Sequence, residues 1–313
     1  MEDLFALKYA VIMGGLSAER DVCMLEGEEI FQILSEQGIE VKKIFIDGDL
    51  FEVYKILSST HIDFAFLSVP EDLPIQDLLE MLHIPYTGSK RLPTALCMDK
   101  VLTKRLVQSL GIITPRFVAG KFIEDENYSP QIAQFKAEIL AGLQFPCVVK
   151  PANLGTSIGI TIVKSQKELV SAIEMALDYS SSLLVEEFIE GREITIPMMG
   201  TDFFGVVEIR PTKSSIYDNT AKMDNLRTQI CPADFSDDMY KTIKEQANTL
   251  YTYFGCKGLI RIDAILREGM MYFLEINTLP FLVGQCAPVQ VARYNYHLSK
   301  LDFVLRVIKE NLL

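Results

Sequence analysis

Two segments near the C-terminal end constrain the fold of this chain most strongly, Leu259–Leu266 and Met271–Asn277. Both alternate apolar with polar residues, a pattern typical of β-strands, and Arg267–Gly269 between them favours a hairpin turn. Because side chains alternate between the two faces of a strand, antiparallel pairing would bring four polar side chains to one face. These are Arg261, Asp263, Glu275 and Asn277.

The chemistry of this face favours a metal site. Carboxylate and amide oxygens are the ligands that Mg²⁺ takes in proteins, usually together with the oxygens of a nucleotide phosphate. A ladder of surface salt bridges is the alternative interpretation, but Asp and Asn are poor strand formers and need a reason to occur there. We therefore predict that Asp263, Glu275 and Asn277 bind Mg²⁺.

Composition disfavours several classes of function. The 313 residues carry a formal net charge of −12, which argues against nucleic acid as a partner because its phosphates demand a basic surface. The chain does not open on a signal-peptide pattern, and its apolar runs are shorter than the roughly 20 residues of a membrane span, so we expect neither export nor membrane insertion. The six cysteines are scattered without a CxxC pair, which favours reduced thiols in the cytoplasm over disulfides or zinc.

The first part of the chain has the order of elements of a small open α/β sheet. An apolar strand over Tyr9–Met13 ends in Gly14-Gly15, and a helix is predicted from about Asp21 to Gln37. Further strands are predicted over Val41–Ile46 and Asp63–Ser68, so the unit opens as a βαβ motif. Its glycine turn reads GGxSxER and not GxGxxG, which disfavours a dinucleotide-binding dehydrogenase.

Two loops in the middle of the chain are suited to phosphate. A strand over Phe145–Pro151 includes Lys150, and a loop rich in Gly, Thr and Ser, Asn153–Gly159, follows it. Backbone N–H groups and hydroxyls in such a loop can bind a phosphate, to which Lys150 would add a point charge; an ordinary hairpin turn is the alternative. Farther on, Pro211–Pro232 has no clear period and contains Lys222, and loops of this length in compact domains are often functional.

Nine motifs, in order along the whole chain, resemble the D-alanine:D-alanine ligase family of the ATP-grasp superfamily. They are GGLSAER, IPYTGS, MDKVLTK, FPCVVKPANLGTSIG, VEEFIEGRE, YDNTAK, CPA, RID and LEINTLP. The resemblance implies an α/β (α+β) chain with the ATP-grasp fold, in which a small open parallel α/β domain precedes two α+β domains that clamp ATP. We place these domains at residues 1–95, 96–187 and 188–313.

The resemblance also implies which residues bind the nucleotide and its metal. Two Mg²⁺ ions, for which Mn²⁺ can substitute, would be held by Asp263, Glu275 and Asn277. The residues implied for ATP are Lys100 and Lys150 at the phosphates, Gly155 and Ser157 in the loop over the γ-phosphate, Glu186, Glu187 and Ile189 along the adenine, and Glu193 at the ribose.

Four residues are implied in catalysis by the same resemblance. Thr156 belongs to the glycine loop that would close over the γ-phosphate, and Lys222 would reach this phosphate from the other side. Arg261 would steady an acyl phosphate and the tetrahedral oxyanion, and Glu19 would hold the ammonium of the first amino acid. Attack of a carboxylate on a γ-phosphate brings two anions together, so cations and metal must offset their repulsion.

The amino-acid end of the implied site departs from the family pattern at four positions. Phe66 stands where the family has a histidine, and Met223 stands where tyrosine is common. Phe281 replaces a glycine of the oxyanion hole, and Cys286 replaces a serine that takes the carboxylate of the second substrate. We therefore predict an altered pocket around the amino acids, formed by these four residues and Glu19.

The simplest prediction is a cytoplasmic D-alanine:D-alanine ligase that forms a dipeptide through an acyl phosphate, for the synthesis of peptidoglycan precursors. Its small-molecule partners would be ATP and amino acids, and a homodimer is compatible with the resemblance. A ligase of the same family that joins a different amino acid or amine is one alternative. A non-catalytic module that binds nucleotide for regulation is the other, although such a module would usually lack the metal ligands or the lysines.

Overall fold

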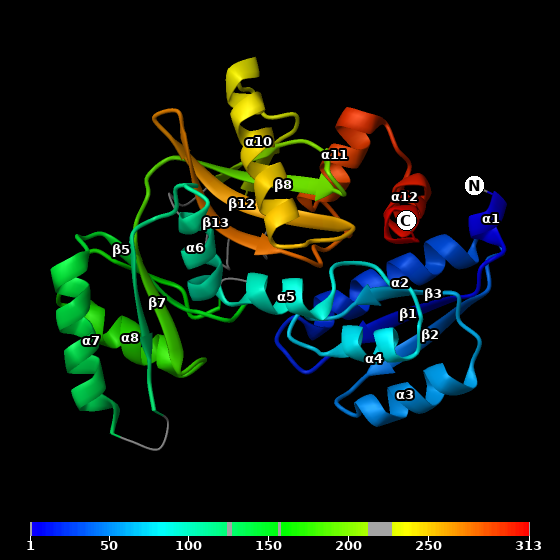
Figure 1. The fold of residues 1–313 in the computed structure, drawn as a ribbon, viewed down its shortest axis with the longest axis horizontal. Helices are drawn as coiled ribbons and strands as arrows, with labels where there is room; N and C mark the ends of the chain where they lie inside the picture. Colours follow the sequence, from blue (N-terminus) through cyan, green and yellow to red (C-terminus); the bar gives the residue numbers. More distant parts are fainter. Residues whose placement is uncertain (1, 124–126, 156–157, 212–226, 313) are drawn as a thin grey trace.

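Three β-sheets organise the protein, which is represented by a computed structural model that describes residues 2–123, 127–155, 158–211 and 227–312. Figure 1 shows the N-terminal and central sheets toward opposite ends of the longest axis, with the C-terminal sheet between them. Within the described ranges, no helix combines the length and apolar character that crossing a membrane requires.

The N-terminal sheet has three parallel strands in the order β2-β1-β3. Its strands are β1 (Tyr9–Gly14), β2 (Val41–Ile46) and β3 (Phe64–Ser68), and the helices around it are α1 (Glu2–Phe5), α2 (Arg20–Ser35), α3 (Leu50–Ser59) and α4 (Ile75–Met81). Val11 and Met13 of β1 pack into one apolar core, whereas Ala10 and Ile12 pack into another on the opposite face. The chain leaves β1 at Gly14, where φ is 114° and an added Cβ would lie 2.5 Å from the carbonyl oxygen of Ile46, so this turn requires glycine.

The central sheet has four antiparallel strands in the order β4-β7-β5-β6. They are β4 (Phe117–Lys121), β5 (Cys147–Pro151), β6 (Thr161–Val163) and β7 (Ser182–Glu187), and the helices α7 (Tyr128–Gly142) and α8 (Leu169–Leu177) pack against them. Val149 and Val185 belong to the apolar core beneath these helices. Because strand side chains alternate, their neighbours Lys150 and Glu186 project from the opposite face.

The C-terminal sheet has the strand order β11-β10-β8-β12-β13, with β9 paired to β8. Its elements are β8 (Arg192–Met199), β9 (Asp202–Phe203), β10 (Val207–Pro211), β11 (Arg227–Ile230), β12 (Leu259–Arg267), β13 (Met270–Asn277) and the helix α10 (Asp237–Tyr253). The predicted hairpin is confirmed, since β12 pairs antiparallel with β13 and places Arg261 opposite Asn277 and Asp263 opposite Glu275. Ile260 and Ile262, on the other face of β12, share an apolar core with α10.

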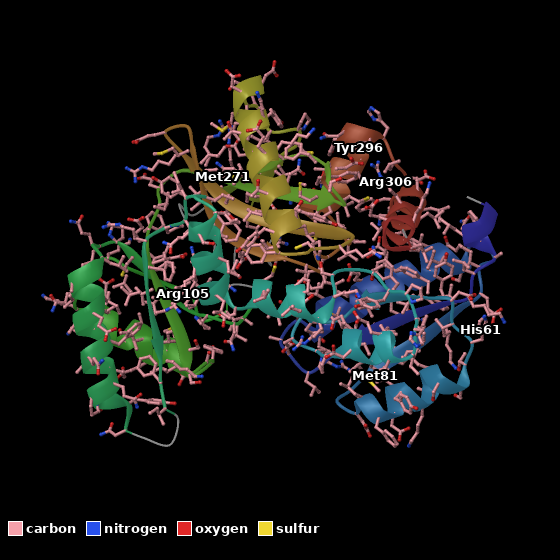
Figure 2. The ribbon with its side chains drawn as sticks, in the orientation of Figure 1. His61, Met81, Arg105, Met271, Tyr296 and Arg306 are labelled. Carbon is pink, nitrogen blue, oxygen red and sulfur yellow. The ribbon has the colours of Figure 1, made fainter. Side chains whose placement is uncertain are left out.

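Two pairs of helices join the three sheets. Helices α5 (Arg91–Met98) and α6 (Lys100–Ser109) lie against β13 and follow the N-terminal unit in the chain. Helices α11 (Ala287–Tyr296) and α12 (Lys300–Leu312) close the chain, and α12 packs on α2, so that Phe303 shares a core with Tyr9. Figure 2 shows Tyr296 and Arg306 next to each other on these last helices, with the Arg306 guanidinium 4.9 Å from the ring centre.

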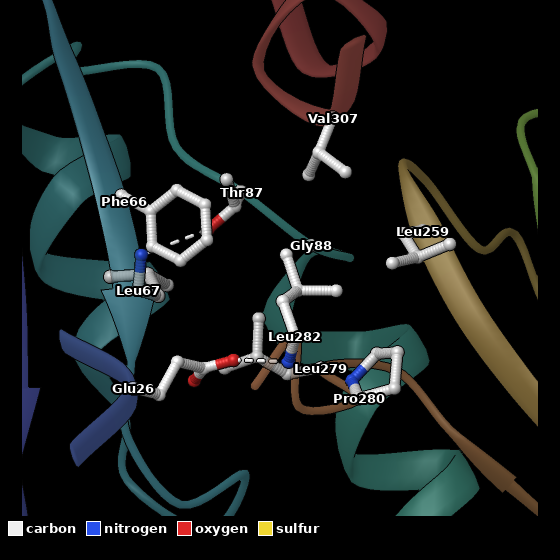
Figure 3. A pocket seen from close by; sticks show the side chains of 10 residues that line it. All are labelled: Glu26, Phe66, Leu67, Thr87, Gly88, Leu259, Leu279, Pro280, Leu282 and Val307. Carbon is white, nitrogen blue, oxygen red and sulfur yellow. Dashed lines mark hydrogen bonds between the residues drawn. The ribbon is translucent and has the colours of Figure 1, made fainter. Parts of the chain in front are cut away.

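A buried carboxylate also ties the N-terminal unit to the chain that follows β13 (Figure 3). Glu26 of α2 accepts a hydrogen bond from the backbone N–H of Leu282 at 2.5 Å, and its other oxygen lies 2.6 Å from the Ser68 hydroxyl at the end of β3. Ser68 also lies 2.7 Å from the carbonyl oxygen of Cys23, to which its single proton can be donated. The same proton can be donated to Glu26, and the hydrogen bonds from Ser68 and Leu282 act to lower the pKa of Glu26. Burial is the larger effect and raises this pKa to about 7.

This pKa predicts how stability changes with pH. Because the pKa of Glu26 is higher in the folded chain than its ordinary value of 4.5, stability falls as pH rises from about 4.5 to about 7 and then stays level. Glu26→Gln keeps a neutral side chain that can donate to Ser68 and accept from Leu282, so it should be more stable than the wild type above pH 7, by about 3 kcal/mol at most.

Urea unfolding between pH 4.5 and 8.5 measures this difference. The control is Glu36→Gln, an exposed position just after the same helix, which should run parallel to the wild type. Equal pH slopes for the wild type and Glu26→Gln would contradict a neutral Glu26.

Candidate active site

Helix α6 carries two buried lysines toward the centre of the molecule. Its N-terminus is capped by Asp99, whose side chain accepts hydrogen bonds from the backbone N–H groups of Val101 and Leu102, both at 3.0 Å. Lys100 and Lys104 lie one turn apart and therefore on one face of the helix. The ammonium of Lys100 donates to the carbonyl oxygen of Leu154 at 2.6 Å and lies 3.3 Å from a carboxylate oxygen of Glu275.

A second group of charges lies between α6 and the central sheet. Glu186 is buried, and each of its carboxylate oxygens contacts a different lysine. One oxygen pairs with Lys104 at 2.8 Å, and the other accepts a hydrogen bond from Lys150. Although burial alone would raise the pKa of Glu186, these two ammonium groups hold it below its ordinary value.

Lys104 is a residue that we did not single out from the sequence. It is fully buried at 0% exposure, and burial lowers its pKa to about 8 despite the opposing effect of Glu186. The available signal was its spacing of four residues from Lys100 within MDKVLTK, which places both ammonium groups on one helix face. The acidic partner, Glu186, however, lies in the strand β7, 82 positions farther along the sequence, so that no local pattern around Lys104 predicts the pair.

The predicted metal ligands are brought together on the half-buried polar face of the β12–β13 hairpin. Asp263 accepts hydrogen bonds from the Thr195 hydroxyl at 2.6 Å and from the Asn277 amide at 3.4 Å, and it pairs with Arg261 at 2.8 Å. Glu275 stands directly opposite Asp263 across the two strands. Two carboxylates and one amide oxygen on a shared face are hard oxygen donors, which fits Mg²⁺.

The predicted metal ligands Asp263, Glu275 and Asn277 include only two acidic residues. Among the described residues, no group of three or more His, Cys, Asp or Glu is placed to hold a metal ion. Any ion on the hairpin would therefore need oxygens from a bound phosphate or from water to complete its shell, as is usual for Mg²⁺. It would also replace the contacts that Arg261 and Lys100 make with the two carboxylates.

Glu19 lies at the N-terminal end of α2 and faces the same region. A Cβ added to Gly155 would approach its carboxylate to 2.5 Å, so the end of the loop after β5 lies directly against it. Burial raises the pKa of Glu19 to about 7, with smaller contributions from the nearby acids Glu71 and Asp72, while Arg261 and Lys100 act in the opposite direction. Glu19 is therefore close enough to Arg261 and Lys100 to belong to the same site.

The residues predicted for adenine and ribose follow the strand β7. Glu187 binds the backbone N–H of Arg116 at 2.8 Å and its guanidinium at 3.0 Å, which fixes the edge of the sheet. Ile189 is buried just beyond this strand. Glu193 is half-buried in β8, opposite Ile265 of β12. These three residues form a continuous run from the central sheet into the C-terminal one.

The predicted amino-acid pocket is only partly described. Thr156 and Ser157 of the glycine loop, and Lys222 and Met223 of the long loop, lie outside the described residues. Phe281 is half-buried between β13 and α11, and Cys286 is the residue that precedes α11. Phe66 is instead a core residue at 2% exposure, in the middle of β3, and it lines a small apolar pocket with Leu282 (Figure 3).

Glu71 holds the segment that follows β13, a role that the sequence did not indicate. One of its oxygens accepts hydrogen bonds from the Thr278 hydroxyl and the Leu279 backbone N–H, both at 2.7 Å, and from the Thr278 backbone N–H. Burial raises the pKa of Glu71, and these hydrogen bonds oppose that shift. The segment Thr278–Leu282 is thus fixed by Glu71 at one end and by Glu26 at the other.

This arrangement predicts a difference between two substitutions of Glu71. Glu71→Ala would leave buried donors of Thr278 and Leu279 without an acceptor and should destabilise the protein by about 2–3 kcal/mol, because each such group costs about 1–3 kcal/mol. Glu71→Gln keeps an acceptor oxygen at the same place and should cost less. Urea unfolding of both variants measures this, and equal losses would show that the hydrogen bonds do not matter.

Comparison with known proteins gives one consistent family. The family model described as "D-ala D-ala ligase C-terminus" matches residues 106–289. The chain is 39% identical over 284 residues to a D-alanine–D-alanine ligase of Carboxydothermus hydrogenoformans, covering 88% of each protein. It is 38% identical over 298 residues to a D-alanine–D-alanine ligase of Desulforamulus reducens, covering 92% of this chain and 94% of that one.

Solved structures agree along the whole length. A D-alanine–D-alanine ligase of Bacillus anthracis in complex with ATP superposes with a TM-score of 0.80 at 25% identity, covering 98% of this chain and 97% of that one. The VanG D-Ala:D-Ser ligase of Enterococcus faecalis gives a TM-score of 0.80 at 26% identity, covering 98% of this chain and 99% of that one.

Proposed function

The chain belongs to the D-alanine–D-alanine ligase family, and on this premise we propose that it is an ATP-dependent ligase that joins two amino acids, with D-alanine as the first candidate for both. The family and the ATP-grasp fold expected from the sequence are confirmed. The observation that supports the activity most directly is the contact of Lys100 with Glu275, which brings a predicted phosphate-binding cation to 3.3 Å from a predicted metal ligand.

The described charges suit the binding of a polyphosphate. Lys100 and Lys150 would contact the phosphates of ATP, and the glycine loop Gly155–Gly159 would close over the γ-phosphate. The run Glu186–Ile189 with Glu193 would hold the adenosine. Asp263, Glu275 and Asn277 would hold Mg²⁺, which when bound neutralises phosphate charge and acts as a Lewis acid. The lysines would be partly neutralised by acids in the free protein and would exchange these partners for phosphate oxygens.

The reaction we propose has two steps. A carboxylate oxygen of the first amino acid attacks the γ-phosphorus, and ADP leaves, which forms an acyl phosphate. The amine of the second amino acid, in its neutral form, then attacks the acyl carbon. The bond from this carbon to the phosphate oxygen breaks, inorganic phosphate leaves, and the nitrogen loses one proton, which the phosphate can take, as the peptide bond forms. Glu19 would hold the ammonium of the first amino acid and Arg261 would stabilise the oxyanion, while Thr156 and Lys222 would act at the γ-phosphate. Loop closure must exclude water, which would otherwise hydrolyse the acyl phosphate.

A different amino acid at the second position is the competing proposal. It is favoured by Phe281 and Cys286, which depart from the family pattern beside α11. A thiol is a weaker hydrogen-bond donor than a hydroxyl and should hold a substrate carboxylate less well. D-Serine is a natural candidate to test, since the VanG enzyme, a D-Ala:D-Ser ligase, is among the similar structures.

The domain boundaries, the role in the cell, the location and the oligomeric state are also proposals. We propose domain boundaries at 1–95, 96–187 and 188–313, a division supported by the presence of one of the three sheets in each range. A role in the synthesis of peptidoglycan precursors, a cytoplasmic location and a homodimer are proposed from the family resemblance.

The activity can be tested by following phosphate release from ATP with D- and L-amino acids, singly and in pairs, and by identifying the product by mass spectrometry. Release that depends on two amino acids, with a D-alanyl-D-alanine product, would support the proposal. A mixed dipeptide such as D-alanyl-D-serine would favour the competing one. Binding of ATP without turnover for any pair would contradict both and favour a regulatory module.

Loss of a metal ligand should abolish most of the activity. Removing a group that merely supports a ligand costs about 10- to 100-fold, so Asp263→Asn or Glu275→Gln should lower turnover by about a hundredfold or more. Glu268→Gln, in the exposed turn of the same hairpin, is the control and should be unaffected. Near-normal turnover of either ligand variant at saturating Mg²⁺ would refute the metal assignment.

Glu19 should make binding of the first amino acid dependent on pH. Its pKa of about 7 means that the carboxyl is largely neutral at pH 6 and largely charged at pH 8. Since only the charged form attracts an ammonium, the KM for the first amino acid should fall as pH rises through 7. Steady-state kinetics of the wild type and Glu19→Gln between pH 6 and pH 8.5 measure this. A wild-type KM that follows the same pH profile as Glu19→Gln would remove Glu19 from this role.

A further inference from the structure

The pairing of two lysines with one carboxylate at Glu186 is unusual for a buried site. Lys104 is 0% exposed, Glu186 is 4% exposed and Lys150 is 6% exposed. A single ammonium would neutralise the carboxylate, and a second one adds repulsion between the two cations. Because buried charges are costly unless they are paired, an additional buried cation requires a reason.

The two lysines differ in what else they contact. The Lys150 ammonium makes its hydrogen bond to Glu186, and its strand leads directly into the loop that would cover the phosphates. Lys104 instead also donates to the Thr114 hydroxyl at 2.6 Å, and this hydroxyl donates to the carbonyl oxygen of Phe273 in β13 at 2.9 Å. The aromatic ring of Phe117 adds a further contact, 5.9 Å from ammonium to ring centre.

Lys104 is therefore fixed between two sheets, whereas Lys150 makes its hydrogen bond to Glu186 alone and belongs to the strand that precedes the glycine loop. A lysine that turns from Glu186 to a phosphate would leave a buried carboxylate uncompensated if it were the only cation. Lys104 removes this difficulty, since it remains paired to the other oxygen at 2.8 Å. The presence of Lys104 thus has a physical explanation. It keeps Glu186 compensated when Lys150 exchanges this carboxylate for a phosphate.

We propose that Lys104 is the permanent counterion of Glu186 and thereby a positioning residue that allows Lys150 to leave Glu186 for a phosphate of the bound nucleotide. This inference rests on the proposed function, because it assumes that a nucleotide phosphate is the alternative partner of Lys150. Lys104 itself would contact neither the nucleotide nor the amino acids.

Lys104→Met tests this, because methionine preserves most of the volume of the side chain and removes its charge. Lys150 would then be the sole counterion of Glu186 and would be retained by it. We expect the dissociation constant of ATP to rise by about tenfold or more, as for the loss of a hydrogen bond to a charged group. The dissociation constant of adenosine, which has no phosphate, should change by less than about twofold. The control is Arg105→Met, the exposed neighbour on the same helix labelled in Figure 2, which should leave both constants unchanged.

A second substitution separates this role from simple packing. In Glu186→Gln the carboxylate is absent, so removing Lys104 as well should have no further effect on ATP binding. The double variant Lys104→Met/Glu186→Gln should therefore match Glu186→Gln within about twofold, although Lys104→Met alone is weakened. Isothermal titration calorimetry with ATP and with adenosine gives all of these constants.

The outcomes are distinguishable. Equal losses for ATP and adenosine in Lys104→Met, or a further tenfold loss in the double variant relative to Glu186→Gln, would overturn the role of Lys104. If Lys104→Met does not fold, the test is the dissociation constant of ATP for Glu186→Gln compared with that for the double variant. The double variant lacks the charges of both Lys104 and Glu186. If the wild-type protein itself does not bind ATP, the proposed function fails and not merely this inference.

Discussion

The pairing of β12 with β13 is the constraint on which the candidate site depends. Arg261 stands opposite Asn277 and Asp263 opposite Glu275, while Ile262 between them faces the apolar core. A slip of one residue in either strand would reverse its faces and bury a carboxylate beneath α10. The core on one face therefore holds the charges on the other in place, and β8 fixes Asp263 from its second side through Thr195.

Charge pairing then connects this hairpin to the other parts of the molecule. Glu275 of β13 contacts Lys100 of α6, and Lys104 on the same helix contacts Glu186 of the central sheet. Glu275 and Glu186 thus each have a basic partner from another element, whereas Asp263 pairs with Arg261 of its own strand. Such a network keeps the buried charges compensated, and on the proposed function it would exchange partners with phosphate and metal at a lower cost than a set of isolated charges.

Local patterns in the sequence were sufficient for some of these features and not for others. The hairpin and its acidic face follow from the period of two, and the strand that carries Lys150 follows from its apolar run. The strand β3 was also foreseen, but the burial of Phe66 within it was not, because the family comparison gave only a position in a motif. Lys104, Glu26 and Glu71 could not be recognised, since their partners Glu186, Leu282 and Thr278 lie 82, 256 and 207 residues away in the sequence.

The same long-range contacts explain how the segment after β13 tolerates Phe281 where the family has glycine. Among the described residues, the only non-glycine ones with φ between +20° and +160° are His83, Glu268 and His297, so the backbone at Phe281 does not require glycine. Glu71 and Glu26 fix the backbone before and after it through the N–H groups of Leu279 and Leu282. The direction of the backbone donors is therefore set by two acids that the substitution leaves in place. On the proposed function, the phenylalanine would change the volume and polarity next to the second substrate, and we therefore expect Phe281 to affect the choice of substrate more than the ability to catalyse.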